Sequence, residues 1–210
     1  MFSGLNYSEI FVLLISLIIS VTLHEAMHGY VAHWLGDDTA NDQGRLTINP
    51  LKSVDLYTTI LLPLVLIAIG GYPIMAAKPV PVDFNRLKFE EFGMALVGLA
   101  GPFTNLLLAV IAGLVLRFNY YSLGLNFSND LLLFVQTNIA LFVFNMIPIP
   151  PLDGSRVLYA FAPESLRKLM TQFESYGFLS ILIIFVIVIQ VPAFSQGLYN
   201  IETGLIHLIV

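Results

Sequence analysis

The chain has 210 residues, 57% of them hydrophobic and only 11% charged, with a mean hydropathy of +0.84 and a formal net charge of −5. Soluble domains are about a quarter charged and could not hide this much apolar surface, so we expect a polytopic membrane protein embedded in a lipid bilayer. The absence of cysteine excludes disulfides and thiolate metal sites, and the acidic balance argues against nucleic acid as a partner. No obligate protein partner is visible in the sequence.

Apolar runs of helical length follow one another along the chain, separated by short polar segments. Long apolar helices are predicted over 7–35, 93–116, 131–147 and 177–191, a shorter helix over 153–170 and an interfacial helix over 192–210. We therefore expect an all-α integral membrane protein, a polytopic transmembrane helix bundle. Because no internal repeat or linker interrupts it, residues 1–210 are expected to form one domain.

The segment between the first two long helices is less regular. A polar loop over 36–55, with β-prone residues at Arg45–Ile48, precedes an apolar run over 56–75 that is broken by two prolines and two glycines. Residues 56–81 either cross the membrane or enter and return as a short re-entrant or β element. The re-entrant interpretation places eight of the nine Lys and Arg residues on one side, with Arg117 opposite. By the positive-inside rule that side is cytoplasmic, in a bacterial-type inner membrane.

The strongest chemical signal is the motif HEAMH, from His24 to His28, inside the first apolar helix. Residues four apart share a helix face, so both imidazoles can reach one metal ion, and Glu25 can act as the base for a metal-bound water. The alternative is a pair of core histidines beside a snorkelling glutamate. Ionisable groups in an apolar helix are costly and usually functional, which favours the metal site.

A catalytic zinc site normally has three protein ligands and an open position, so a third ligand is needed. His33 is rotated away from the HEAMH face, and His207 lies in the chain's last helix. Asp153, which follows an apolar run and several prolines, is the acidic residue in the most apolar surroundings. Its alternative role is an ordinary helix N-cap. By elimination we predict one zinc ion per chain, held by His24, His28 and Asp153.

Two asparagines in apolar surroundings are further candidates for contact with a substrate or an oxyanion. Asn145 lies close to Asp153 in the sequence, which favours a role at the site. Asn105 interrupts another apolar helix, and interhelical hydrogen bonding is the favoured interpretation for it.

The motifs together resemble the site-2 protease family of intramembrane zinc metalloproteases, in a minimal form without PDZ or CBS domains. The resemblance rests on HEAMH and on NMIPIPPLDG, Asn145–Gly154, and it extends to NPLKSVD (Asn49–Asp55), GGYP and AKPVPV (Gly70–Val82) and AGPFTN (Ala100–Asn105). It implies that His24, His28 and Asp153 are zinc ligands, that Glu25 is the base and that Asn145 lies near the substrate carbonyl.

The expected function is therefore hydrolysis of a peptide bond within or near a transmembrane segment of a membrane-protein substrate, as in regulated intramembrane proteolysis. Two other classes stay open. One is a metal-ion transporter or channel, which needs ligands weak enough to release the ion. The other is an inactive relative that acts as a scaffold.

Overall fold

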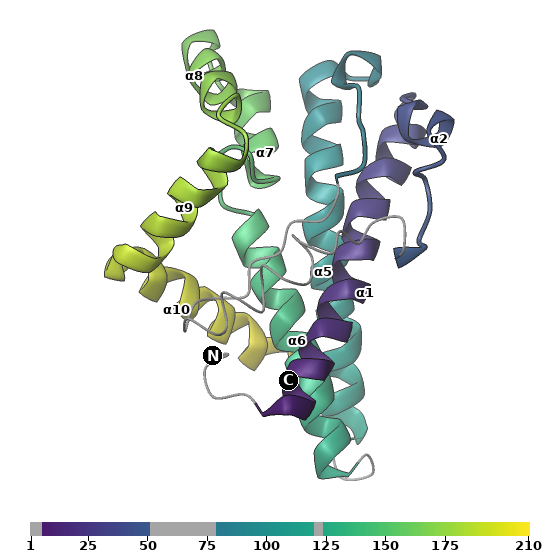
Figure 1. Ribbon diagram of the computed structural model, residues 1–210, viewed down its shortest axis with the longest axis vertical. Coiled ribbons are helices and arrows are strands. Elements are labelled where there is room, and N and C mark those ends of the chain that lie inside the picture. Colours follow the sequence, from purple (N-terminus) through teal and green to yellow (C-terminus); the bar gives the residue numbers. More distant parts are fainter. Residues whose placement is uncertain (1–5, 51–78, 120–123) are drawn as a thin grey trace.

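The computed structural model describes residues 6–50, 79–119 and 124–210, and over these residues it contains helices and no strand (Figure 1). The expected all-α helix bundle is confirmed. The helices are α1 (Tyr7–Trp34), α2 (Thr39–Asp42), η2 (Phe84–Arg86), α5 (Glu90–Asn119), α6 (Leu125–Asn145), α7 (Gly154–Phe161), α8 (Glu164–Glu174), α9 (Phe178–Gln190) and α10 (Pro192–Ile209). The predicted re-entrant element falls mostly on residues 51–78, which lie outside the described ranges.

Three of the described helices are long and apolar enough to cross a membrane, namely Tyr7–Trp34, Glu90–Phe118 and Leu125–Asn145. They correspond to the first three helices predicted from the sequence. The first begins at a capping box, in which the Asn6 side chain accepts from the Glu9 amide and Glu9 accepts from the Asn6 amide. This reciprocal pair satisfies two amide groups that the helix cannot bond internally.

Helix α5 lies at the centre of the bundle and packs against α1, α6, α7 and α10 (Figure 1). Helices in lipid associate through close packing of small residues rather than through the hydrophobic effect. This is visible where Ala109 and Ala112 of α5 pack against Val135 and Ile139 of α6, all four buried. A side chain at Gly113 would come within 2.1 Å of Ile209, so α10 also depends on a small residue in α5.

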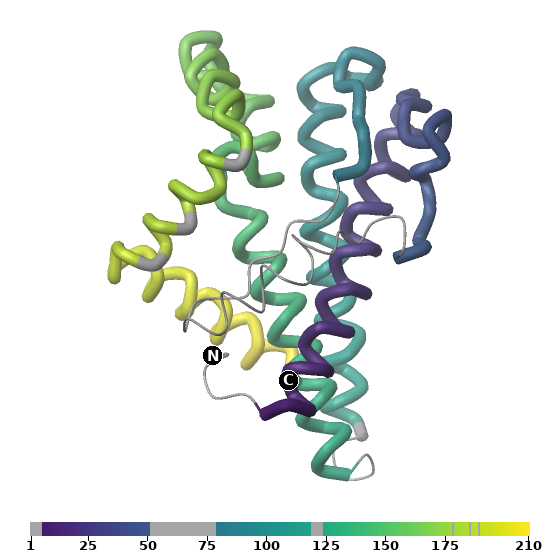
Figure 2. The backbone as a smooth tube through the Cα atoms, in the orientation of Figure 1, coloured from purple at the N-terminus to yellow at the C-terminus, as the bar shows by residue number. Residues whose placement is uncertain are grey.

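The C-terminal third differs from the sequence prediction in two ways. The helix expected over 153–170 is divided into α7 and α8 at Ala162–Pro163, because the residue before a proline avoids helical geometry. The apolar run 177–191 forms α9, but its 13 residues extend only about 20 Å, less than the roughly 30 Å of a bilayer core. The chain then turns back into α10 at Pro192 (Figure 2). Helix α9 alone is thus too short to span.

Most of the described Lys and Arg residues gather at one end of the bundle. The end of α1, the start of α5, and helices α7 and α8 lie at this end, whereas the end of α5 and the start of α6 lie at the opposite end (Figure 1). Arg86, Arg156 and Arg167 belong to the first group, and Arg117 lies in the last turn of α5. Over the described residues, this distribution matches the charge asymmetry predicted from the sequence.

Candidate metal centre

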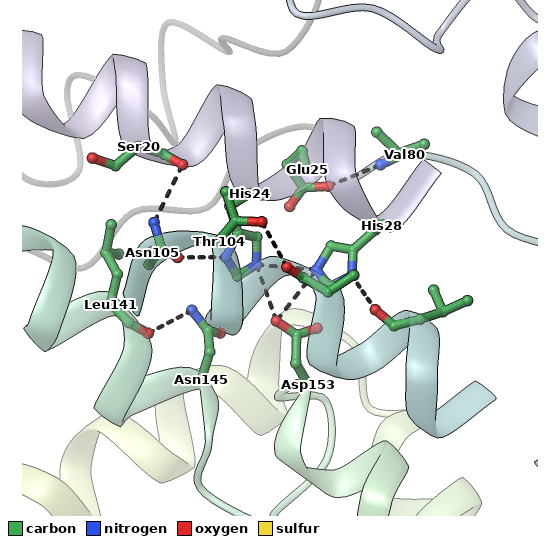
Figure 3. A network of polar contacts seen from close by, with 12 residues as sticks. Ser20, His24, Glu25, His28, Val80, Thr104, Asn105, Leu141, Asn145 and Asp153 are labelled. Atoms are coloured by element: carbon green, nitrogen blue, oxygen red, sulfur yellow. Dashed lines mark hydrogen bonds and ion pairs between the residues drawn. The ribbon is translucent and has the colours of Figure 1, made fainter. Parts of the chain in front are cut away.

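The two histidines of HEAMH lie one turn apart on the face of α1 that packs against α5 (Figure 3). Both are buried, and their Nε2 atoms are 3.0 Å apart. The shared face follows from the spacing of four residues in a helix of 3.6 residues per turn. The motif therefore brings the Nε2 atoms of two histidines close together.

Asp153 reaches the same point from the connection between α6 and α7. Its Oδ2 atom is 3.0 Å from His24 Nε2 and 3.4 Å from His28 Nε2. It occupies the N-cap position of α7, but its side chain makes no capping hydrogen bond. A side chain at Gly154 would come within 2.4 Å of the Met146 carbonyl oxygen, so the turn that delivers Asp153 requires glycine there.

The hydrogen-bond partners of the two rings determine where their protons lie. His28 Nδ1 is 2.7 Å from the Val97 carbonyl oxygen, and His24 Nδ1 is 2.6 Å from Asn105 Oδ1. The carbonyl can only accept, so Nδ1 of His28 carries the hydrogen, and the hydrogen bonds of Asn105 described below assign the same tautomer to His24. In the neutral rings both Nε2 atoms thus present lone pairs to each other and to the Asp153 carboxylate.

Three electron-pair donors that converge in this way repel one another unless a metal ion or a proton lies between them. The ligand atoms of His24, His28 and Asp153 lie within 4.8 Å of one another. Two neutral imidazoles and one carboxylate form a ligand set typical of a catalytic zinc site, with room left for a water or a substrate. The donor set therefore fits the predicted zinc ion, and these three side chains are the ones that would hold it.

Helix α5 makes this approach possible because it carries glycine where the site is tightest. A Cβ atom at Gly101 would lie 2.4 Å from His28 Nε2 and 2.5 Å from His24 Nε2. A Cβ atom at Gly98 would lie 2.9 Å from the Asp153 carbonyl oxygen. Gly101 belongs to the AGPFTN motif noted in the sequence, and Gly98 was not singled out there; both positions carry the small residue that close helix contacts in membranes favour.

Glu25 lies beside the histidines, and its contact is with the backbone of a distant segment. Its Oε2 atom accepts a hydrogen bond of 3.0 Å from the Val80 amide, and the side chain is half-buried (Figure 3). Val80 belongs to the stretch 79–83, which is neither helix nor strand, and it contacts α1. A Cβ atom at Gly29 would be only 2.9 Å from the Val80 side chain, so the glycine after His28 allows this approach.

The two candidate asparagines have different surroundings. Asn145 is half-buried near Asp153, and its Nδ2 donates to the Leu141 carbonyl one turn earlier in α6 (Figure 3). Asn105 is fully buried and makes hydrogen bonds to α1 and α6, as the interhelical interpretation expects. A substrate-binding role for either residue stays a prediction.

Asp37 holds the stretch 79–83 in place from the loop after α1. It is buried and accepts hydrogen bonds from the Thr39 amide, the Thr39 hydroxyl and the Asp83 amide. Burial raises the pKa of this carboxyl, but the hydrogen bonds from Thr39 and Asp83, with the charge of Arg86, outweigh it and leave the pKa below its ordinary value. The charged form is therefore the one that the fold stabilises.

We expect Asp37→Ala to lower the free energy of unfolding by about 3 kcal/mol at pH 7, because several hydrogen bonds to a charged group are lost. A depressed pKa stabilises the fold fully above the unfolded-state pKa of about 4, and the effect is lost as pH falls through the folded-state value. The difference in the free energy of unfolding between wild type and variant should thus shrink in acid, as measured by denaturation in mixed micelles. Asp38→Ala, at an exposed neighbour, is the control and should have little effect at either pH.

Comparison with known proteins supplies the family. The model of peptidase family M50 matches residues 12–130 and 120–189, which includes every residue of the centre. This chain belongs to peptidase family M50. The resemblance to site-2 proteases is confirmed by this match, and the chain is accordingly a metallopeptidase of an integral membrane class.

Several M50 relatives resemble the chain over most of its length. YwhC of Bacillus subtilis, named as a candidate zinc metalloprotease, is 44% identical over 185 residues, covering 83% of this chain and 80% of that protein. Rip2 of Mycolicibacterium smegmatis, named in the same way, is 28% identical over 197 residues, covering 93% and 73%. The zinc metalloprotease MJ0392 of Methanocaldococcus jannaschii is 30% identical, covering 71% of this chain and 34% of that protein. No solved structure gives a significant match.

Proposed function

We propose that this M50 member is a zinc-dependent intramembrane endopeptidase, formed as a single domain over residues 1–210 and holding one zinc ion per chain. The observation that carries the proposal is the convergence of His24 Nε2, His28 Nε2 and Asp153 Oδ2 inside the bundle, with the Glu25 carboxylate beside them. Zinc, when bound, supplies Lewis acidity, which makes water a proton donor near neutral pH and polarises a carbonyl group.

Glu25 is the general base in this proposal. Its position next to the ligand histidines, without a contact to either ligand nitrogen, suits a group that takes a proton from water and later gives it to the leaving amine. The Val80 amide holds one of its oxygens, which restricts the carboxylate to a few orientations. The side chain of Asp153 is 22% exposed, so the site is not sealed against water.

The substrate that suits this site is a transmembrane segment whose helix has opened locally. Amide groups inside a helix are bonded to one another, so a peptide bond can be attacked only after that pairing is lost. Residues 79–82 are neither helix nor strand, and the Val80 amide donates to Glu25. In this proposal they pair with an unwound chain, as an added strand pairs with a sheet edge. We propose that Asn145, whose side chain lies near Asp153, binds the carbonyl of that chain.

The basic end of the bundle is proposed to face the cytoplasm, in a bacterial-type inner membrane. The positive-inside rule supports this orientation, because this end of the bundle carries Arg86, Lys88, Arg156, Arg167 and Lys168. The chain has no cysteine, so a single cysteine introduced at Lys88 or at Arg117 can be labelled selectively. The side of the membrane from which each cysteine is labelled reports the orientation. Labelling of both from the same side would contradict the proposed orientation.

The test of the function is a paired measurement on the purified full chain in detergent, with bound zinc and cleavage of a transmembrane peptide determined on the same sample. We expect about one zinc per chain and cleavage that a chelator abolishes and added zinc restores. Zinc binding without cleavage of any transmembrane peptide would support the inactive scaffold instead. Zinc movement across vesicles that contain the protein would support the transporter.

A further inference from the structure

The two site histidines differ in what holds their Nδ1 hydrogens. His28 is held by a backbone carbonyl, that of Val97, which no substitution can remove. His24 is held by the side chain of Asn105, an amide that could present either its oxygen or its nitrogen to the ring. The tautomer of His24, and hence the direction of its lone pair, depends on which way the Asn105 amide faces.

A second asparagine decides that orientation. Asn138 of α6 donates from Nδ2 to the Phe134 carbonyl at 2.9 Å, so its oxygen faces Asn105. Asn105 in turn donates from Nδ2 to Asn138 Oδ1 at 3.1 Å. It also donates from Nδ2 to the Ser20 carbonyl at 3.3 Å (Figure 3). Both amide hydrogens of Asn105 are thereby directed at acceptors, and its oxygen is left to accept from His24 Nδ1 at 2.6 Å.

The reverse orientation of Asn105 is costly because both asparagines are fully buried. Turning the amide over would place its oxygen against Asn138 Oδ1 and the Ser20 carbonyl, two acceptors. Buried acceptors that lose their donors destabilise the fold, because they have given up water without gaining a partner. The same flip would point N–H groups at His24 Nδ1, which would move the ring hydrogen to Nε2, the atom that faces Asp153.

We propose that Asn105 and Asn138 are positioning residues of the metal centre. Asn138 orients the Asn105 amide, and Asn105 keeps the hydrogen of His24 on Nδ1, so that the Nε2 lone pair faces Asp153 and His28. The two amides thus connect the ligand histidine of α1 to both α5 and α6. This inference rests on the proposed function, because it assigns the pair a role in holding the metal.

The test compares two substitutions of Asn105 in the full chain, with zinc affinity measured by competition against a chelator in detergent. Asn105→Leu keeps the volume but removes the acceptor, and we expect its zinc affinity to fall about 10–100-fold. Asn105→Asp loses the donors to Ser20 and Asn138 but keeps an oxygen that accepts from Nδ1. We expect its affinity to exceed that of Asn105→Leu by about tenfold or more, because carboxylates serve as partners of metal-bound histidines.

Thr137→Val is the matched control, because Thr137 is buried next to Asn138 and its hydroxyl donates only to the Leu133 carbonyl of its own helix. It should bind zinc as wild type does. Asn138→Leu, which leaves Asn105 in place, should weaken zinc binding about tenfold. If Asn105→Leu does not fold, the comparison of Asn138→Leu with wild type tests the proposal instead.

Wild-type affinity in the folded Leu variants would overturn the proposal. Equal losses in Asn105→Asp and Asn105→Leu would also overturn it, because a role confined to helix packing predicts no rescue by aspartate. If the wild-type chain binds no zinc, the proposed function itself fails, and that result is obtained before any variant is compared.

Discussion

Glu25→Gln should abolish at least about 99% of the proteolytic rate while the zinc content stays at the wild-type level, because losing general acid–base help costs a hundredfold or more. A glutamine oxygen can still accept the hydrogen bond from the Val80 amide, so the stretch 79–83 should remain in place beside α1. A carboxamide cannot take a proton from water at neutral pH. The measurement is zinc content and peptide cleavage on the same purified sample.

Asp153→Asn provides the contrast. It removes an anionic oxygen that lies 3.0 Å and 3.4 Å from the two histidine nitrogens, so zinc and activity should fall together. The pair of variants separates a base from a ligand. Cleavage by Glu25→Gln at a rate near wild type would rule out its role in proton transfer, and loss of zinc from that variant would place Glu25 among the ligands.

Gly101→Ala should empty the metal centre although it changes no polar group. The added methyl carbon would lie 2.4 Å from His28 Nε2 and 2.5 Å from His24 Nε2, closer than any carbon approaches a nitrogen without bonding. The rings must turn away or α5 must move, and either displacement separates the ligand atoms. We expect most of the bound zinc and nearly all cleavage to be lost, as measured by metal analysis and peptide hydrolysis.

Gly113→Ala is the matched control in the same helix. Its methyl group would meet the Ile209 side chain at 2.1 Å, an equally severe contact far from the ligands. It should lower the stability of α10 packing without changing zinc affinity. Normal zinc binding by Gly101→Ala would show that the histidines are not held against α5 as described here.

The sequence predicted the helices and the candidate ligands because their signals are local. The spacing within HEAMH sets a shared helix face, and apolar runs of bilayer length predict spanning helices whatever their neighbours. Asp153 is predicted by elimination among the acids and by its apolar surroundings, and the family resemblance of NMIPIPPLDG supports it. Elimination is needed because an Asp at the start of a helix is also a common N-cap. In the structure Asp153 makes no capping hydrogen bond, which favours the proposed ligand role over the N-cap.

The features that could not be predicted depend on partners distant in the chain. Asn138 looked like any amide in an apolar helix, and only its contact with Asn105 of α5 gives it a place next to His24. The hydrogen bond from Val80 to Glu25 joins two segments that no periodicity connects. Helix α9 was expected to span because its run is strongly apolar, but its length is fixed by Pro192 and Gly177 at its ends.

The division of the ligands between α1 and the turn after α6 has a consequence for biosynthesis. Residues 29–152 separate His28 from Asp153, and at about 5–20 residues per second roughly 6–25 seconds pass between their synthesis at the ribosome. During that interval the nascent chain carries two histidines and a glutamate in the bilayer without the aspartate that completes the set. The proposed hydrolytic centre therefore cannot assemble until α6 and the turn that follows it have been made.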